Sequence, residues 1–326
     1  MRRLAFIAAC CAAATPAAAF DLEGHRGGRG LLPENTLPAF ARALSIGVDT
    51  LELDTGITSD GVVVISHNRR LDPAITRGPD GKWLTAPGPA IHDLSLAELR
   101  RYDVGQINPD APYARQFPDQ VAVPHTPIPT WDELAALVAK SANKTVRFNV
   151  ETKLSPLAPA ETLEPRPFVE ALVAALRKSG LANRTMIQSF DWRTLKIVQQ
   201  TAAEIPTVCL TIERGADANI RRGQTDASPW LAGLKLEDYG GSVPLLVQAA
   251  GCRVWSPFFR DMTDASLGEA KSLGLQVVVW TVNEPTDMTA LLDRGVDGII
   301  TDYPDRLRSV LAARGLPLPP ATPVLP

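Results

Sequence analysis

The sequence predicts an α/β chain of the TIM-type (β/α)8 barrel class, and two observations carry this prediction. Short strand-like runs alternate with amphipathic helical runs over most of the 326 residues, which is the pattern of a parallel sheet covered by helices. Eight of these runs read as barrel strands, the number that closes this fold. With 45% hydrophobic and 21% charged residues the chain can bury one large core, so we expect a single domain over residues 20–315.

The strands are expected where β-favouring residues are bounded by turn or helix signals. They lie at 24–27, 50–54, 145–153, 185–190, 207–212, 253–258, 276–282 and 298–302. A further run, 62–67, follows the turn residues Ser59-Asp60-Gly61, so we interpret it as a β-hairpin partner of the second strand. Setting it aside leaves eight strands for the barrel.

Helix start and stop signals separate these strands. Thr36 is a predicted N-cap before Leu37, Phe40 and Leu44 on one face, and Gly47 follows as a stop. Capping boxes are expected at Ser95/Glu98 and Thr130/Glu133, helix ends at Gly180, Gly274 and Gly295, and the last two helices at 285–295 and 304–315.

Two segments do not fit the alternation. The stretch 69–144 is too long for an ordinary connection and rich in Pro, Gly and polar residues, so we expect a small insertion near the barrel mouth. The tail 316–326 contains five prolines and cannot propagate a helix, so it should be disordered or extended.

The first 19 residues have the pattern of a signal peptide. Arg2 and Arg3 precede an apolar run and then a small-residue cleavage pattern ending at Ala19. This predicts export across the inner membrane, with a periplasmic location. Cys10 loosely resembles a lipoprotein processing site, but the apolar core before it is short, so lipid anchoring is the less favoured alternative.

Charge and hydropathy exclude two classes of partner. Loss of residues 1–19 would remove two arginines and no acidic residue, changing the net charge from −3 to −5, which argues against nucleic acid. No run after residue 19 reaches the roughly 18 uncharged apolar residues of a membrane span. We therefore expect a small-molecule substrate. The oligomeric state is not predicted.

Only Cys209 and Cys252 remain after residue 19. They would pair in an oxidising compartment if their strands are neighbours. Two buried, unpaired thiols are the alternative that we favour from the sequence.

The chemistry-bearing residues lie where predicted strands end, as in barrel enzymes generally. Glu52 and Asp54 are spaced by two, as are Glu151 and Lys153, so each pair faces one side of its strand. Carboxylates that converge on one point repel unless a cation lies between them. Three carboxylates, Glu52, Asp54 and Glu151, thus predict one divalent cation, and all-oxygen ligands favour Mg²⁺ or Ca²⁺ over Zn²⁺.

Two histidines and two cations accompany the carboxylates. His25 ends the first predicted strand and His67 ends the hairpin, and each can serve as a general acid or base near neutral pH. Arg26 and Lys153 add the positive charge that stabilises a phosphoryl group as negative charge develops. The combination indicates phosphodiester cleavage.

A set of short motifs runs through the same residues: His25-Arg26-Gly27, Pro33-Glu34-Asn35-Thr36, Glu52-Leu53-Asp54, Thr58-Ser59-Asp60-Gly61, Val64 to His67, Glu151-Thr152-Lys153 and Trp280-Thr281-Val282-Asn283. Over about residues 22–305 these motifs resemble the glycerophosphodiester phosphodiesterase family. The resemblance implies a (β/α)8 barrel that uses a divalent cation to release glycerol 3-phosphate and an alcohol from a glycerophosphodiester. The roles it implies are metal ligation by Glu52, Asp54 and Glu151, acid and base catalysis by His25 and His67, phosphate contact by Arg26 and Lys153, and a pocket wall at Trp280.

One residue departs from the family pattern. The family usually has His-Asp where this chain has His67-Asn68. An amide can still accept a hydrogen bond but adds no negative charge, so the pKa of His67 and the firmness with which it is held are open.

Two other functions fit part of the pattern. A phospholipid lyase of the same barrel type would stop at a cyclic phosphate. A non-catalytic phosphate-binding barrel would bind phosphate without turnover, which the altered pair at residues 67–68 slightly favours. Both histidines and all three carboxylates are nevertheless present, so hydrolysis is the function we predict.

Overall fold

The computed structural model describes residues 20–326, except 216–217 and 225. The predicted signal peptide at 1–19 lies outside the described residues. Within them, eight parallel strands close a barrel, because β1 pairs with both β2 and β9. The barrel strands are β1 (Asp21–Gly24), β2 (Thr50–Ile57), β4 (Arg147–Thr152), β5 (Thr185–Ser189), β6 (Thr207–Thr211), β7 (Val254–Pro257), β8 (Gln276–Val279) and β9 (Gly298–Thr301).

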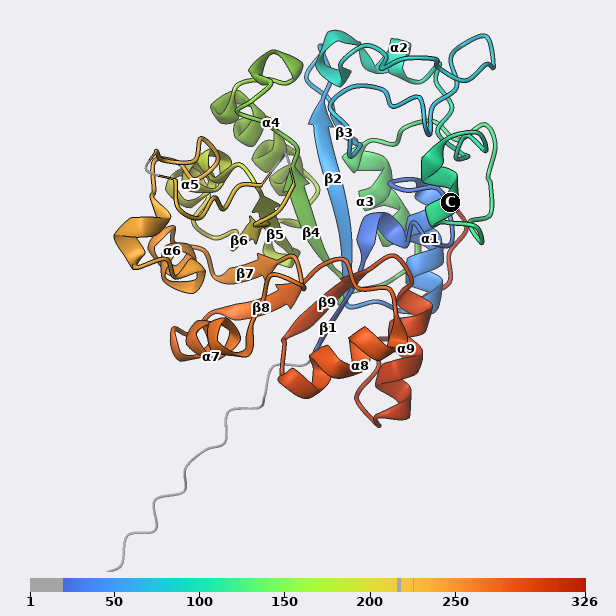
Figure 1. Ribbon diagram of the computed structural model, residues 1–326. Helices are drawn as coiled ribbons and strands as arrows, with labels where there is room; N and C mark the ends of the chain where they lie inside the picture. Colours follow the sequence, from blue (N-terminus) through green and yellow to red (C-terminus); the bar gives the residue numbers. More distant parts are fainter. Residues whose placement is uncertain (1–19, 216–217, 225) are drawn as a thin grey trace, which may run out of the picture.

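Helices connect the strands and form the outer layer of the barrel (Figure 1). They are α1 (Leu37–Ile46), α3 (Trp131–Lys140), α4 (Pro165–Lys178), α5 (Trp192–Thr201), α6 (Val243–Ala249), α7 (Asp264–Ser272), α8 (Pro285–Arg294) and α9 (Pro304–Ala313), with the short α2 (Leu96–Leu99) in the insertion. Thr36 caps α1, and both predicted capping boxes are present, at Ser95 and Thr130. The predicted fold class is therefore confirmed.

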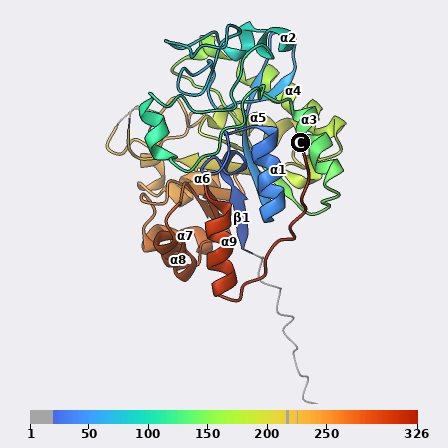
Figure 2. The same cartoon turned by 90° about the vertical axis from the view of Figure 1, so that its right-hand side faces the viewer.

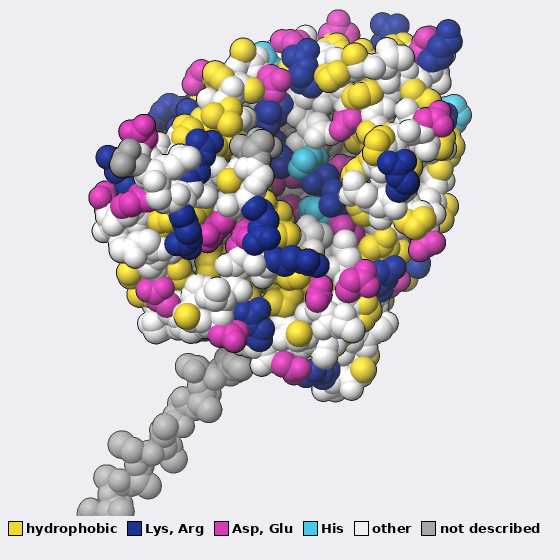
Figure 3. All heavy atoms as spheres, in the orientation of Figure 1, with side chains coloured by type: hydrophobic (Ala, Val, Ile, Leu, Met, Phe, Trp, Pro, Cys, Tyr) yellow, Lys and Arg dark blue, Asp and Glu magenta, His cyan; other side chains and the backbone are white. Residues whose placement is uncertain are grey.

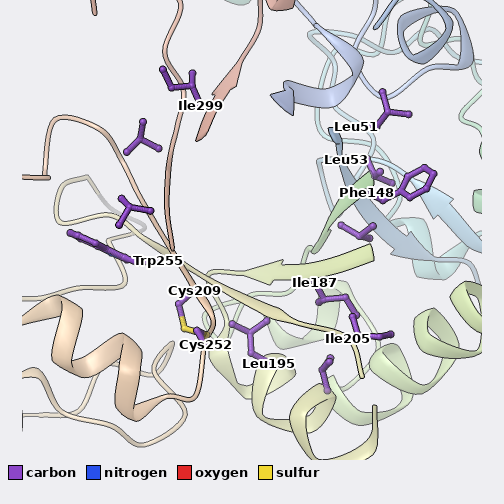
Figure 4. Packing of buried hydrophobic residues seen from close by; sticks show 14 of the residues in the cluster. Leu51, Leu53, Phe148, Ile187, Leu195, Ile205, Cys209, Cys252, Trp255 and Ile299 are labelled. Carbon is purple, nitrogen blue, oxygen red and sulfur yellow. A yellow bond between two sulfur atoms is a disulfide. The ribbon is translucent and has the colours of Figure 1, made fainter. Parts of the chain in front are cut away.

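The alternation of side chains along each strand divides the interior from the shell. Leu51 and Leu53 of β2 belong to the large core cluster between strands and helices (Figure 4). Glu52 and Asp54 alternate with them and so face the barrel interior. On the opposite half of the barrel the interior is apolar, formed by a separate cluster of Val208, Val254, Val278 and Ile300. The barrel thus has a polar half at β1, β2, β4 and β5 and an apolar half at β6–β9.

Several predicted strand ends were wrong by a few residues. The first strand ends at Gly24, so His25 and Arg26 lie in a 3₁₀ turn, His25–Gly27, after the strand. The strand predicted to start at residue 145 begins at Arg147. Trp280 follows β8 and forms only an isolated bridge with Phe258. Turn geometry rather than strand periodicity thus places the first two site residues.

The predicted hairpin is confirmed, and the insertion lies above it. β3 (Val63–Ile65) pairs antiparallel with β2. The following segment has its own small hydrophobic cluster, which includes Val64, Leu71, Ile91 and Leu99. Figure 1 shows α2 and the surrounding loops beyond β3, at the end of the barrel to which β2 points. The insertion therefore lies at the mouth, where the C-terminal strand ends gather.

The preference for unpaired cysteines was wrong. Cys209 of β6 and Cys252, just before β7, form a disulfide with a Cα–Cα distance of 5.8 Å, visible in Figure 4. β6 and β7 are hydrogen-bonded neighbours, so a cysteine within β6 and one just before β7 lie close together. Adjacency brings them within the separation that a disulfide requires.

The tail 316–326 is extended, one of the two predicted alternatives. Figure 2 shows it running from the end of α9 along the outside of the barrel. Thr322 N donates to Leu44 O at 2.8 Å, and Arg308 Nη1 donates to Pro319 O at 2.7 Å. Among the described helices, none has the length and apolar character needed to cross a bilayer.

Candidate active site

The turn after β1 brings the first site residues into the barrel mouth. Arg26 adopts a positive φ of 51°, and the following Gly27 adopts 80°. A Cβ on Gly27 would lie 2.9 Å from backbone and side-chain atoms of Ala39, so only glycine allows the turn to pack against α1. In this conformation Arg26 N donates to Glu52 Oε2 at 2.8 Å, and its side chain turns toward Glu34.

The three predicted metal ligands converge. Asp54 on β2 is the register partner of Glu151 on β4, and Glu52 precedes Asp54 on the same face. Carboxylate oxygens of all three lie within 4.8 Å of one another, and all three residues are buried. Lys153 Nζ lies 2.8 Å from Glu151 Oε1 and 3.5 Å from Asp54 Oδ1. A positive charge thus already contacts two of the carboxylates.

Burial and charge give the carboxylates different pKa values. Burial, reinforced by the neighbouring charge of Asp54, raises the pKa of Glu52 well above its ordinary value. Burial also raises the pKa of Glu151, to about 7, even with Lys153 beside it. Burial acts in the same direction on Asp54, but the charges of Lys153, His67 and Arg26 outweigh it and hold the pKa of Asp54 well below its usual range. The raised pKa values of Glu52 and Glu151 indicate that the cationic side chains of the protein do not fully compensate the negative charge of the three carboxylates.

His25 is held from behind by a carboxylate. Its Nδ1 lies 2.6 Å from Asp302 Oδ1, which also accepts from Arg29 Nε at 2.7 Å. Its Nε2 lies 4.0 Å from Glu52 Oε2. Burial, then the charge of Arg29, lowers the pKa of His25 to about 4, although Asp302 acts in the opposite direction. His25 is therefore neutral at pH 7, with Nε2 toward the carboxylates.

His67 is held by the residue that departs from the family pattern. Its Nδ1 lies 2.9 Å from Asn68 Oδ1, and Asn68 Nδ2 donates to Asp72 Oδ2 at 2.7 Å. The amide of Asn68 thus accepts the hydrogen bond that the sequence left open. Burial, followed by the charges of Arg26 and Lys153, lowers the pKa of His67 well below its ordinary value.

A cavity of about 610 Å³ opens beside these groups. Its floor includes His67, Glu151 and Lys153, and its wall includes aromatic residues. Trp280 lies in that wall with its ring centroid 5.4 Å from that of Phe190, and its indole N–H donates to Ser256 O at 3.0 Å. Figure 3 shows histidine and Lys/Arg side chains inside a hollow on this face.

The predicted site residues fall into two groups by depth. His67, Glu151, Lys153 and Trp280 line the cavity, whereas the other four do not. The four buried beside it are His25, Arg26, Glu52 and Asp54. Direct contacts join the groups, since Lys153 reaches Asp54, and Arg26 Nε lies 3.3 Å from Asp54 Oδ2. The structure therefore brings all eight predicted residues into one site, with Trp280 on the cavity wall.

Several residues in the site were not predicted from the sequence. Asp302 orients His25, and its place directly after the last strand could have identified it. Gln188 Nε2 donates to Glu52 Oε1 at 2.6 Å, and a glutamine within a predicted strand was the available signal. Glu34 and Asn35, which precede the cap residue Thr36, are two further residues of the site. Arg26 donates to Glu34 at 2.7 Å, and Asn35 donates to Asp54 at 2.9 Å.

The residues present fit a divalent cation. The three carboxylates supply only oxygen donors, are buried, and have raised pKa values at two of the three positions. A cation would lower both pKa values by compensating the charge. The Lys153 ammonium, in contact with Glu151 and Asp54, marks where positive charge is favoured.

Comparisons with known proteins indicate the same family as the sequence motifs. The model of the "Glycerophosphoryl diester phosphodiesterase family" matches residues 25–306. A glycerophosphodiester phosphodiesterase of Bacillus subtilis (strain 168) is 29% identical over 292 residues, which cover 88% of this chain and 84% of the relative.

Solved structures share the barrel. One from Silicibacter pomeroyi DSS-3, described as a candidate glycerophosphoryl diester phosphodiesterase, has 35% identity and a TM-score of 0.79, covering 93% of this chain and 96% of that one. A phosphodiesterase from Oleispira antarctica, solved with the product sn-glycerol-3-phosphate, has 20% identity and a TM-score of 0.63, covering 89% and 96%. At that identity the second likeness shows the fold alone.

Proposed function

The chain belongs to the glycerophosphoryl diester phosphodiesterase family, and from this premise we propose that it hydrolyses glycerophosphodiesters to glycerol 3-phosphate and an alcohol by two-histidine acid and base catalysis with a divalent cation. Membership makes it a glycerophosphodiester phosphodiesterase. The observation that carries the finer proposal is the convergence of Glu52, Asp54 and Glu151 within 4.8 Å, in a site that also holds two histidines.

Glu52, Asp54 and Glu151 would hold the cation, Mg²⁺ or Ca²⁺. When bound, such an ion polarises a phosphoryl oxygen and compensates negative charge. Gln188 and Asn35 hold Glu52 and Asp54 in place by direct hydrogen bonds. Such partners keep ligand oxygens in a fixed orientation.

The two histidines have different partners, which suggests different roles. The carboxylate of Asp302 favours a proton on His25, whereas His67 has only the neutral amide of Asn68. We assign His67 as the base that takes the proton of the attacking hydroxyl and His25 as the acid that protonates the leaving oxygen. Both have lowered pKa values, so the anionic substrate phosphate must raise the pKa of His25 for this role.

Arg26 and Lys153 would contact the phosphate. Both are cations held against the carboxylates, Arg26 at 3.3 Å and Lys153 at 3.5 Å from Asp54. Fixed donors of this kind stabilise charge that develops in the transition state. Trp280, together with Phe190, would form the apolar wall beside the reacting group.

The test is product analysis with glycerophosphocholine as substrate. Phosphorus NMR of the reaction of the chain 20–326 should show glycerol 3-phosphate. Accumulation of a cyclic phosphate would favour the lyase instead, and absence of turnover with tight phosphate binding would favour the non-catalytic barrel. His25→Ala and His67→Ala should each lower turnover by about a hundredfold or more. Near-normal turnover in either variant would contradict its role.

The site of action is also a proposal. Residues 1–19 would direct export, and the chain would act in the periplasm. The Cys209–Cys252 pairing supports this, because disulfides form and persist in oxidising compartments. Cell fractionation with N-terminal sequencing should find the chain in the periplasm, beginning at Phe20. Retention in the cytoplasm with residues 1–19 attached would contradict it.

A further inference from the structure

Tyr113, from the insertion, lies between Arg29 and Glu34, two residues that contact different parts of the site. It belongs to a 3₁₀ turn, Pro112–Gln116, and its hydroxyl donates to Glu34 Oε2. The same hydroxyl accepts from Arg29 Nη1 at 3.1 Å. No strand or helix of the barrel supplies this residue. Its hydroxyl therefore connects two side chains that reach the site by separate routes.

The first route leads to His25. Arg29 Nε donates to Asp302 Oδ1 at 2.7 Å, and the same oxygen lies 2.6 Å from His25 Nδ1. Asp302 is almost fully buried, with 1% of its side chain exposed, and its other oxygen accepts from Asn283 Nδ2 at 2.7 Å. Arg29 thus helps to fix the carboxylate oxygen that orients His25.

The second route leads to Arg26. Glu34 Oε1 accepts from Arg26 Nη1 at 2.7 Å, while its other oxygen is bound by Tyr113. The Arg26 Nε atom is buried and has no hydrogen-bond acceptor within the described part of the chain, although Asp54 Oδ2 is 3.3 Å away. Among the described residues, Glu34 is therefore the hydrogen-bond acceptor of the guanidinium, with Asp54 as a second ion-pair partner.

We propose that Tyr113 is a positioning residue that couples the His25–Asp302 pair to the phosphate-binding Arg26 through its contacts with Arg29 and Glu34. The coupling rests on the proposed function, since it assigns the insertion a part in that reaction. Without the hydroxyl, Glu34 loses one of its two fixed donors and Arg29 loses one acceptor. Arg29 then gains freedom to move away from Asp302, and Glu34 holds Arg26 less firmly beside the reacting phosphate.

The hydroxyl is not needed to attach the insertion to the barrel. Gln120 Nε2 donates to Arg29 O at 2.6 Å, and Val121 N donates to Leu31 O at 2.9 Å. The ring of Phe117 lies 5.0 Å from the Arg29 guanidinium carbon. These contacts remain when only the hydroxyl is removed. Tyr113→Phe should therefore fold normally and test the hydroxyl alone.

The experiment compares Tyr113→Phe with Tyr102→Phe, a matched control in the same insertion whose hydroxyl makes no hydrogen bond to any described residue. With glycerophosphocholine and added Mg²⁺ or Ca²⁺, Tyr113→Phe should lower kcat about tenfold, the effect of one hydrogen bond to a charged group. KM should change less than about twofold, because the loss is in orientation at the transition state. The thermal midpoint should equal that of the control.

Two results would overturn the proposal. One is a kcat for Tyr113→Phe equal to that of Tyr102→Phe. The other is a lower thermal midpoint with raised KM and unchanged kcat, which would mean that Tyr113 only anchors the insertion. Glu34→Gln provides a further check, because two residues in one chain of contacts should give a combined loss smaller than the product of the single losses.

A second readout does not depend on turnover. The proton NMR resonance of the His25 Nδ1–H reports its bond to Asp302. It should shift in Tyr113→Phe and stay in place in Tyr102→Phe, whereas an unshifted resonance in both would contradict the coupling. If the unaltered chain shows no turnover but the resonance shifts as expected, the proposed function fails and the coupling stands.

Discussion

Glu23 is a buried carboxylate that the proposed reaction does not use. It lies inside the barrel with no exposed surface, and Asn149 Nδ2 donates to its Oε2 at 2.9 Å. Its Oε1 has no hydrogen-bond partner in the described residues. Burial, followed by the charge of Asp21, raises the pKa of Glu23 well above the ordinary 4.5. Folding therefore takes up a proton, and stability falls as the pH rises from 4.5 toward the folded pKa.

Glu23→Gln should stabilise the protein at neutral pH. The amide has the same shape, and its oxygen can still accept from Asn149. We expect the free energy of unfolding at pH 7 to rise, because the neutral amide does not have to take up a proton on folding, as the buried carboxylate does. Urea denaturation at several pH values measures it. The difference between variant and unaltered chain should disappear below pH 4.5, and a variant that is less stable at pH 7 would contradict this account.

Asn68 is the hydrogen-bond partner of His67, and Asn68→Asp should raise the pKa of His67 by placing a negative charge beside it. If His67 is the base, it must be neutral to act, so the rising limb of the kcat–pH profile should move to higher pH by about one unit. A new carboxylate would also face Asp72, now 2.7 Å from Asn68 Nδ2. The measurement is therefore made in Asn68→Asp/Asp72→Asn as well. A limb that stays in place in both variants would exclude His67 as the base.

At the scale of elements, the disulfide joins β6 to β7 on the outer face of the barrel. It closes a loop with a sequence separation of 43 residues. Cross-links over loops of this size stabilise a protein mainly by restricting the unfolded chain.

The double variant Cys209→Ala/Cys252→Ala should lower the free energy of unfolding by about 2–4 kcal/mol. Chemical denaturation measures this, and a reducing agent added to the unaltered chain should produce a similar decrease. The variant itself should not respond to the reducing agent. Equal stability of variant and unaltered chain would contradict a structural role for the disulfide.

The tail 316–326 connects α9 to α1. Thr322 N donates to Leu44 O near the end of α1, and Asn143 Nδ2 donates to Thr322 Oγ1 at 3.1 Å. Truncation after Gly315 removes these bonds and should lower the free energy of unfolding by about 1–2 kcal/mol. Removal of residues 325–326 alone is the control. A long truncation that unfolds like the control would show that the tail adds no stability.

At the scale of the whole molecule, the barrel interior has a polar half and an apolar half. The polar half carries a hydrogen-bonded chain from Glu23 through Asn149 and Gln188 to Glu52. The apolar half is filled by valines and an isoleucine. The proposed cation site therefore lies at one side of the mouth, and the cavity extends from it toward Trp280.

Local patterns were sufficient to predict most of this architecture. Alternation of strand and helix signals located the barrel strands, and Thr36, Ser95 and Thr130 begin helices as expected. Spacing by two also placed Glu52 and Asp54 on one face. Strand alternation, helix caps and spacing by two depend only on residues that are close in the sequence, so they could be predicted from the sequence.

Contacts made by barrel closure and by irregular segments could not be predicted in this way. His25 meets Asp302 across 277 residues, because β1 closes against β9. Tyr113 reaches the site from an insertion without periodicity. The disulfide between Cys209 and Cys252 was accessible in principle, since Cys209 lies within one strand and Cys252 just before the next, but the sequence alone does not show that these strands are adjacent.

The central claim is that Glu52, Asp54 and Glu151 hold a divalent cation on which hydrolysis depends. The most direct measurement is release of glycerol 3-phosphate from glycerophosphocholine by chelator-treated chain 20–326, with Mg²⁺ or Ca²⁺ returned by titration. We predict loss of turnover after chelation, recovery with one of the two ions, and a requirement for much higher ion concentrations in Glu151→Gln. Full turnover by the metal-free chain, or identical ion dependence in Glu151→Gln, would contradict the account.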